Sequence, residues 1–397
     1  MKKLLVLVLA LTCLISAAAA AFAEADFHIG IMTATVSQAE DDMRGAEGLI
    51  ERYGDVANGG MIRHITFPDN FTTEIETTIS QLVGLADDPK MKAIVVVNGP
   101  EGTTEAFRRI KEKRSDILLM VAAALEDPAV IAPVADVCVD VDFIRFGYLI
   151  IASVKKMGAD TFMHISFPRH MSYEVISRRA AVMREACKEM GLEFVLETAP
   201  DPTTDVGVAG TQQYLLEKVP AWFEKYGKNT ALFSTNSAHH EPMIKRIVDN
   251  KAGYYSFGDM PSPIKGFPGA LNVDLTAEKG NWPAIVNKIE KAAVEKGVGG
   301  RLGTWKYSVA FMHGLGLGEF AKRVVEGEAK ITSGKDLVAA YEAYTPGTKW
   351  NIDTYVEAAT QRRLRNFFTI WQAPYVLGSG YVDLSDVTVP DWVNSVK

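Results

Sequence analysis

Apolar runs typical of buried strands alternate with amphipathic segments typical of helices along most of the chain. The run 93–97 is rich in β-branched residues, as expected for a strand buried on both faces. The segment over about 72–87 instead places Ile79 and Leu82 on one helical face. Strands and helices in regular succession predict parallel sheets covered by helices, which defines the α/β class.

The alternation forms two series of about five strands each. In the first series the expected strands are 27–32, 61–66, 93–97, 117–121 and 134–141. In the second series they are 161–166, 193–197, 230–234, 254–257 and 270–274. Two such series predict two doubly wound parallel-sheet lobes joined by a hinge.

The lobe boundaries follow from where the second series begins. We expect the first lobe to hold residues 24–141 plus about 275–330, and the second to hold 142–274 plus about 331–397. Beyond residue 275 the pattern is mainly helical, so crossings between the lobes and covering helices are expected there. The Gly-rich stretch 314–318 has helical flanks and no strand before it, which favours close helix packing over phosphate binding.

The first 23 residues have the pattern of a cleaved secretory signal peptide. Lys2 and Lys3 precede an apolar run over 4–21, and a small-x-small pattern ends the segment. An uncleaved anchor is the alternative, because the run is near the minimum spanning length of about 17 residues. Cys13 follows a threonine rather than a small residue, which disfavours lipidation. The pattern predicts a periplasmic protein without stable membrane insertion after cleavage.

Composition and charge narrow the classes of function. The chain has 397 residues, 48% of them hydrophobic, which excludes a disordered protein or a small disulfide scaffold. Lys and Arg total 42 against 49 Asp and Glu, so nucleic acid is not an expected partner. Cys138 falls in an apolar strand pattern and Cys187 on a predicted helix, so separate buried thiols are expected rather than a disulfide.

Candidate ligand contacts lie at the carboxyl ends of the predicted strands, where open parallel sheets bind their ligands. Amides, carboxylates, hydroxyls and rings gather at these ends, and this mixture suits a small polar ligand. The same residue types also form turns and helix caps. The candidates at these ends are Thr35, Phe67, Asn98, Glu126, Arg169, Asn236, Asp259 and Asp274.

Over about 26–290 the chain resembles the type I periplasmic binding proteins, the ribose-, autoinducer- and nucleoside-binding receptors of ABC importers. The resemblance rests on the opening strand 27–32, on Ser177-Arg178-Arg179-Ala180, on the strand 232–236 and on 270–275. The contacts that it implies are Asn98, Arg178, Asn236, Asp259 and Asp274. The fourth strand ends in alanines at 122–124, where family members often carry Asp, and this disfavours a ribose-like sugar.

The resemblance implies a monomeric receptor that closes on a small molecule and delivers it to an ABC permease and its ATPase, without a cofactor. An alternative is a ligand-sensing receptor for a chemotaxis or histidine-kinase partner. A transcriptional regulator on this fold would need an N-terminal DNA-binding module, where this chain has a signal-peptide pattern.

A periplasmic hydrolase is the alternative from a different class. The sequence contains no Gly-x-Ser-x-Gly, His-Glu-x-x-His or Cys-x-x-Cys motif, so no catalytic residues are assigned. His239-His240-Glu241 is the cluster most similar to a metal site. Adjacent histidines on a helix point about 100° apart, so this cluster fits a helix start better than a metal site.

Overall fold

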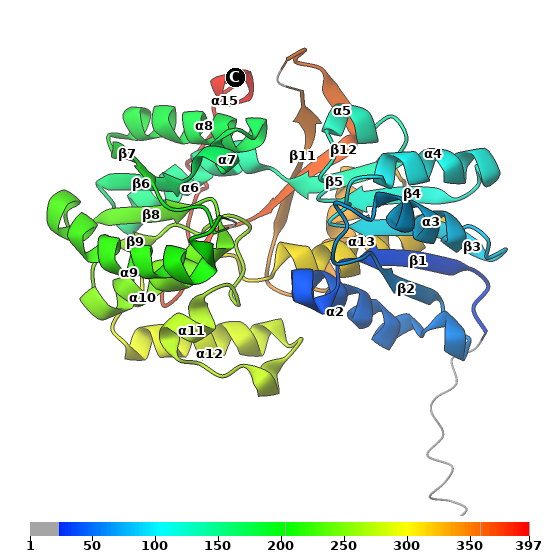
Figure 1. The fold of residues 1–397 in the computed structure, drawn as a ribbon, viewed down its shortest axis with the longest axis horizontal. Coiled ribbons are helices and arrows are strands. Elements are labelled where there is room, and N and C mark those ends of the chain that lie inside the picture. The colour runs from blue at the N-terminus through cyan, green and yellow to red at the C-terminus, as the bar shows by residue number, and fades with distance from the viewer. Residues whose placement is uncertain (1–23, 203, 358, 397) are drawn as a thin grey trace, which may run out of the picture.

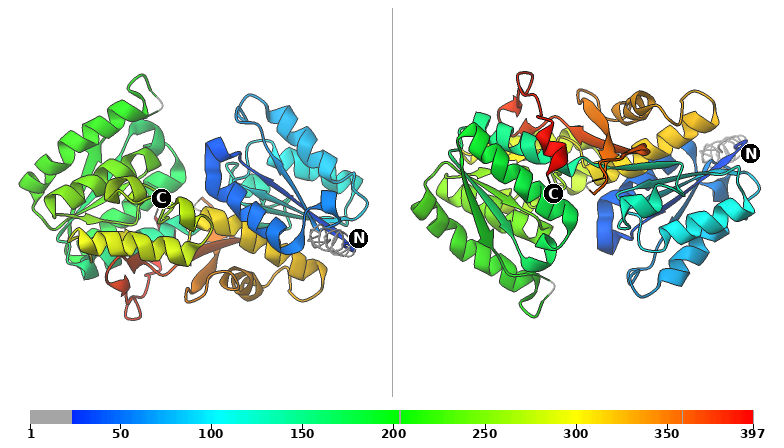
Figure 2. Two further views of the ribbon diagram at one scale, coloured as in Figure 1. Left: turned by 90° about the horizontal axis from the view of Figure 1, so that it is seen from below. Right: turned by 90° about the horizontal axis from the view of Figure 1, so that it is seen from above.

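The computed structural model describes residues 24–202, 204–357 and 359–396, so the expected signal peptide lies outside the described residues. Two lobes lie side by side and are joined near the middle of the molecule (Figures 1 and 2). Each lobe has its own parallel sheet, as predicted. In these described ranges no helix is long and apolar enough to cross a membrane.

The first lobe is built on a seven-stranded sheet in the order β11-β12-β5-β4-β3-β1-β2. The strands are β1 (His28–Thr33), β2 (Ile62–Thr66), β3 (Met91–Val97), β4 (Leu118–Ala122), β5 (Val137–Val141), β11 (Trp350–Val356) and β12 (Arg363–Gln372). All neighbours run parallel except β11 and β12. Residues 93–97 of β3 are fully buried, which confirms the strand predicted to be covered on both faces.

Helices cover both faces of this sheet. They are α2 (Val36–Tyr53), α3 (Ile75–Leu85), α4 (Thr103–Lys113), α5 (Pro128–Ile131), α13 (Val309–Val325) and α14 (Gly334–Glu342). A short 3-10 helix, η1 (Val56–Asn58), precedes β2. Helices α3 and α4 belong to a separate apolar cluster from α2 and α13, because alternate strand residues point to opposite faces.

The glycines of α13 allow it to pack closely on α2. A Cβ atom at Gly314 would lie 3.1 Å from the backbone nitrogen of Ala46, and one at Gly318 would overlap the Leu49 side chain. On the α2 side, a Cβ at Gly45 would overlap the carbonyl oxygen of Phe311. These contacts confirm the prediction that the Gly-rich stretch serves helix packing.

The second lobe has a four-stranded parallel sheet in the order β7-β6-β8-β9. The strands are β6 (Thr161–Ser166), β7 (Glu193–Thr198), β8 (Thr230–Ser234) and β9 (Tyr254–Tyr255). The helices are α6 (Phe143–Met157), α7 (Pro168–Met171), α8 (Glu174–Met190), α9 (Gly207–Tyr226), α10 (His240–Asn250), α11 (Phe267–Leu271) and α12 (Trp282–Glu295), with the 3-10 helices η2 (Ser237–His239) and η3 (Thr276–Glu278).

The strand predicted over 270–274 is wrong. The short helix α11 occupies its first residues and ends at Asn272, which has a φ of 55° in the left-handed region. Pro268 lies in the first turn of α11, where its fixed φ and missing N–H favour a helix start. Asp274 therefore follows a turn rather than a hinge strand.

The predicted division of the C-terminal part is also wrong in two places. Helix α12 is predicted to lie in the first lobe, but it packs on α11 of the second lobe. The segments that form β11 and β12 are predicted to be covering helices of the second lobe, but they extend the sheet of the first lobe. Strand β12 pairs with β5 in parallel, and its residues Phe367 and Ile370 are buried. The two strands are far apart in the sequence. Helix α13 packs on α2 and β3 of the first lobe.

The remaining C-terminal elements complete the second lobe. A small antiparallel sheet contains β10 (Gly303–Thr304), β13 (Tyr375–Val376) and β14 (Gly380–Tyr381), and α15 (Trp392–Ser395) follows. The ring of Trp392 meets Tyr148 of α6 at 5.9 Å between centroids. Cys138 and Cys187 are both buried and free, which confirms the prediction of separate thiols.

The chain passes between the lobes three times, after β5, before α13 and after β12. Fully buried Gln372 accepts a hydrogen bond from the Tyr307 N–H at 3.2 Å and donates one to the Tyr307 carbonyl at 2.7 Å. Thr369 donates to Asp142 at 3.0 Å, which joins the first crossing to the third. These bonds connect all three crossings to one another.

Candidate functional site

The strand order of each sheet reverses at one strand, and such a switch point is where open α/β sheets bind ligands. In the first lobe β1 lies between β2 and β3, and in the second β6 lies between β7 and β8. In the first lobe Thr35 follows β1 and Asn98 follows β3, and in the second lobe Asn236 follows β8. The structure therefore places these three candidates at the ends that the sequence predicted.

The side chains of two first-lobe candidates already contact other residues of the first lobe. Phe67 is 1% exposed and meets Phe71 edge to face with centroids 5.5 Å apart, so its ring belongs to the core. Glu126 accepts hydrogen bonds from the backbone of Gly102 at 3.1 Å and of Thr104 at 2.8 Å. A carboxylate there satisfies free N–H groups at the start of α4.

The other two candidates of the first lobe have distinct local geometry. Thr35 precedes α2, and its hydroxyl donates a hydrogen bond to Asp69. Asn98 is half-buried and has a φ of 54°, a left-handed conformation that asparagine tolerates better than most residues.

Three second-lobe candidates also have partners nearby. Arg169 forms a two-pronged ion pair with Asp201, at 2.7 and 3.0 Å. Asn236 accepts a hydrogen bond from the Ala238 N–H at 2.9 Å and so caps η2. Asp274 is exposed and accepts bonds from the N–H and hydroxyl of Thr276, at 2.9 and 2.6 Å.

Arg178 and Arg179 point in different directions although they are neighbours on α8. Arg178 donates to the carbonyl of Asn394 near the C-terminus at 2.7 Å. Arg179 instead pairs with the candidate Asp259 at 2.6 Å, and its guanidinium lies 5.2 Å from the centre of the Phe143 ring and 5.1 Å from that of Phe233. Arg179 is the functional candidate that the sequence analysis missed.

A row of polar side chains follows β6 and β8 beside this ion pair. The Thr235 hydroxyl is hydrogen-bonded to Ser166 at 2.8 Å and to Nδ1 of His170 at 3.1 Å. Burial, with a smaller contribution from Arg169, lowers the pKa of His170. The row therefore presents neutral hydrogen-bonding groups near the ends of both strands. The ligand-binding role of the nine sequence candidates stays a prediction.

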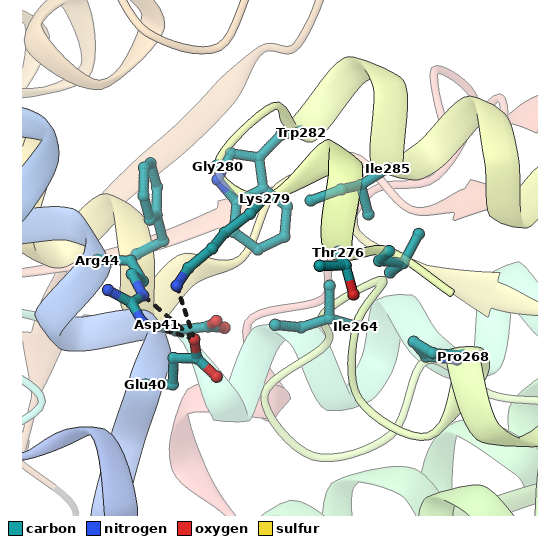
Figure 3. A pocket seen from close by; sticks show the side chains of 12 residues that line it. Glu40, Asp41, Arg44, Ile264, Pro268, Thr276, Lys279, Gly280, Trp282 and Ile285 are labelled. Atoms are coloured by element: carbon teal, nitrogen blue, oxygen red, sulfur yellow. Dashed lines mark hydrogen bonds and ion pairs between the residues drawn. The ribbon is translucent and has the colours of Figure 1, made fainter. Parts of the chain in front are cut away.

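A pocket of about 460 Å³ lies between the lobes, and it is called the interlobe pocket below (Figure 3). Its first-lobe wall consists of Glu40, Asp41 and Arg44 on α2 and Phe311 on α13. Its second-lobe wall consists of Ile264, Pro268, Leu275, Thr276, Lys279, Gly280, Trp282 and Ile285. None of the nine sequence candidates is among these lining residues.

The two walls of the interlobe pocket differ in character. Glu40 pairs with Arg44 at 3.1 Å within the first lobe, and with Lys279 of the second lobe at 4.0 Å (Figure 3). Opposite them, Ile264 and Ile285 contribute apolar surface, with Thr276 between them in the view of Figure 3. The pocket thus has charged groups of both lobes on one side and apolar side chains on the other. This arrangement suits a small solute with one polar and one apolar side.

Buried carboxylates adjoin the interlobe pocket on α2. Asp41 accepts a hydrogen bond from the Ser308 hydroxyl, and burial raises the pKa of Asp41. Burial, and then the charge of Asp41, raises the pKa of Asp42 to about 7. At the first crossing, burial and the charges of Asp259 and Asp142 raise the pKa of Asp140 to about 7.

The described part of the chain contains no group of three or more His, Cys, Asp or Glu side chains placed to hold a metal ion. His239 belongs to η2 and His240 begins α10, as expected for a helix start. Both rings are buried, and Nδ1 of His239 lies 2.7 Å from the Ser234 hydroxyl.

Comparison with solved structures identifies the fold. A crystal structure of a sugar ABC transporter from Actinomyces odontolyticus ATCC 17982 has a TM-score of 0.52 at 10% identity, covering 77% of this chain and 85% of that one. The crystal structure of a protein from Clostridium difficile 630, provisionally described as a transcriptional regulator, has a TM-score of 0.79 at 24% identity and covers 88% and 99%. The fold is that of the type I periplasmic binding proteins, as the resemblance predicted.

Sequence comparison identifies the family. Residues 27–303 match the family described as "Protein of unknown function (DUF3798)". The chain belongs to this family. A relative from Treponema pallidum (strain Nichols), described as an uncharacterized protein, is 45% identical over 179 residues, which are 45% of this chain and 81% of the relative.

Proposed function

We propose that the protein is an extracytoplasmic solute-binding receptor of an ABC importer. The interlobe pocket carries this proposal, because α2 and α13 of the first lobe and the 264–285 region of the second both line it. A solute held there touches both lobes at once. Such contacts favour the arrangement in which the lobes close on the solute, since only that arrangement supplies both walls.

The closed arrangement is the form that a membrane permease and its ATPase would recognise. We expect the receptor to act as a monomer, and the site needs no second copy, since both walls of the pocket come from one chain. The signal-peptide pattern in the sequence supports export to the periplasm. In this proposal the site binds and releases a small polar solute without changing it.

Native mass spectrometry of the protein purified from its own host tests this function. We expect one small molecule per chain, recovered chemically intact after denaturing release. Ile264→Trp fills part of the pocket from its second-lobe wall and should lower the occupancy, whereas Val294→Trp on the exposed face of α12 should not. An altered reaction product in place of an intact solute would contradict the proposal and favour an enzyme.

A further inference from the structure

Two neighbouring carboxylates on α2 lack a counter-ion, and the first of them, Asp41, lines the interlobe pocket. Asp41 and Asp42 are 9% and 3% exposed, and Oδ2 of Asp42 has no hydrogen-bond partner. The cations Arg44 and Lys279 are already paired with Glu40. The side chain of Asp41 accepts a hydrogen bond from the neutral Ser308 hydroxyl. Within the described ranges neither carboxylate has a basic group within 4.0 Å.

Buried carboxylates without a counter-ion are costly, so such a pair must hold a proton or take a cation. The charged group that acts on both from the second lobe is Lys265, which favours their ionised forms from beyond ion-pair distance. Glu40 is the other neighbouring acid that acts on Asp41. The site therefore has a deficit of positive charge that a bound solute can supply.

An independent feature of the same pocket also lacks a partner. Trp282 lines the pocket, is 6% exposed, and its Nε1–H has no hydrogen-bond acceptor. Its ring meets Phe311 edge to face, with centroids 5.3 Å apart. Aromatic faces attract cations, and an unsatisfied indole N–H calls for an acceptor oxygen.

We propose that the interlobe pocket binds a solute that carries a protonated amine beside a polar oxygen. The amine faces Asp41 in the pocket wall, the buried charge of the neighbouring Asp42 adds to its attraction, and the oxygen accepts the hydrogen bond of Trp282. This inference rests on the proposed receptor function and adds the chemical class of its solute. A neutral sugar would leave both carboxylates without a cation, and an anion would be repelled by them.

The charge pairing makes binding depend on pH. The amine favours ionised carboxylates, so its binding releases the proton that the empty pair holds. The affinity for an amine should therefore rise as the pH increases from 5 to 8. The charged groups around the pair are Glu40, Arg44, Lys265 and Lys279, and none of them is a histidine that would change charge over the same interval.

Matched solutes that differ in one charged group test this inference. Thermal shift and calorimetric titration at pH 8 would use three sets: glucosamine, glucose and gluconate; ethanolamine, ethylene glycol and glycolate; and 4-aminobutanol, 1,4-butanediol and 4-hydroxybutyrate. We expect binding by amine members and none by their neutral and acidic counterparts. Stabilisation by a neutral or acidic member alone would overturn the amine assignment but leave the receptor function standing. Failure of every amine would also overturn the amine assignment.

Variants identify which side chains are responsible. Asp41→Asn keeps the shape of the side chain and removes its charge from the pocket wall, so amine affinity should fall at least tenfold and lose most of its pH dependence. Lys265→Gln removes the competing cation and should tighten amine binding. Asp26→Asn, at an exposed position of the first lobe, is the control and should bind as the wild type does. Equal amine affinity in Asp41→Asn and the control would refute the carboxylate assignment, and circular dichroism would verify that both variants fold.

Discussion

Two adjacent arginines show how residue-scale geometry separates neighbours. Successive residues on an α-helix point about 100° apart, so Arg178 and Arg179 leave α8 in different directions. Arg178 reaches the C-terminal segment, and Arg179 reaches Asp259. Gly147 on α6 leaves the space that the Arg179 side chain occupies, because a Cβ there would lie 2.9 Å from its Cγ. The family resemblance implied Arg178, but the structure makes Arg179 the partner of another candidate.

The raised pKa of Asp42 predicts a pH-dependent stability. Its pKa is about 7 in the folded chain, against an ordinary value of 3.8. Between these values the folded chain holds a proton that the unfolded chain has released, so the free energy of unfolding falls as the pH rises from about 4 to about 7. Each pKa unit of the difference corresponds to about 1.4 kcal/mol.

Asp42→Asn removes this cost, so the variant should lose less stability over that interval and exceed the wild type at pH 8. Urea unfolding at pH 5 and pH 8 measures the difference, with Asp26→Asn as the control. In both proteins Asp140 still contributes to the fall of the free energy of unfolding with pH, because its pKa is raised to about 7 as well. Identical slopes in Asp42→Asn and the wild type would contradict the assignment.

At the scale of elements, the contact between α2 and α13 supports one wall of the interlobe pocket. Asp41 on α2 and Phe311 on α13 both line the pocket, and glycines between the helices allow the close approach. A Cβ at Gly45 would lie 2.3 Å from the carbonyl oxygen of Phe311, which is a backbone atom that must shift. The position of this wall therefore depends on a residue without a side chain.

Gly45→Ala should destabilise the protein by about 1–3 kcal/mol, because overlap in a close-packed contact exceeds the gain in helix propensity. Gly84→Ala is the matched control, since Gly84 lies inside α3 with no atom within 4 Å of an added Cβ. The control should gain up to about 1 kcal/mol. Urea midpoints of the two variants give the comparison, and a shift of the same sign in both would argue against close packing at Gly45.

At the scale of the whole molecule, the three crossings hold the lobes in one continuous structure. The main apolar core includes residues of both lobes, and Trp305 packs against Phe146 with ring centroids 4.9 Å apart near the crossings. Gln372 and Tyr307 join two crossings through a pair of hydrogen bonds. Movement of the lobes must therefore occur around a core that stays bonded.

Gln372→Leu keeps most of the side-chain volume but leaves the backbone N–H and carbonyl of Tyr307 without these buried partners. The expected loss is about 2–6 kcal/mol, because two buried groups lose their partners and each unsatisfied group costs about 1–3 kcal/mol. Gln213→Leu, at an exposed position of α9, should change stability by no more than about 0.5 kcal/mol. Chemical unfolding followed by tryptophan fluorescence and circular dichroism measures both variants, and equal midpoints would show that the crossings do not depend on these bonds.

The periodic pattern of the chain was sufficient to predict most elements near the switch points. The helix expected over about 72–87 is α3 (Ile75–Leu85), and the strands expected over 161–166 and 230–234 are β6 and β8. Their apolar periodicity is local and strong, so distant contacts do not alter it. The strand predicted over 270–274 fails because Pro268 and the left-handed Asn272 form a short helix and a turn instead.

The sequence by itself determined the alternating elements, the two-lobed class and the strand ends where candidates gather, since these depend on residues close together in the chain. Only the tertiary structure decided that β12 joins the first sheet and that α2 faces the 264–285 region. The pairing of Arg179 with Asp259 and the missing counter-ion of Asp42 were likewise invisible in the sequence. Such features depend on which distant side chains meet at one place, and in this protein the two walls of the interlobe pocket come from separate lobes.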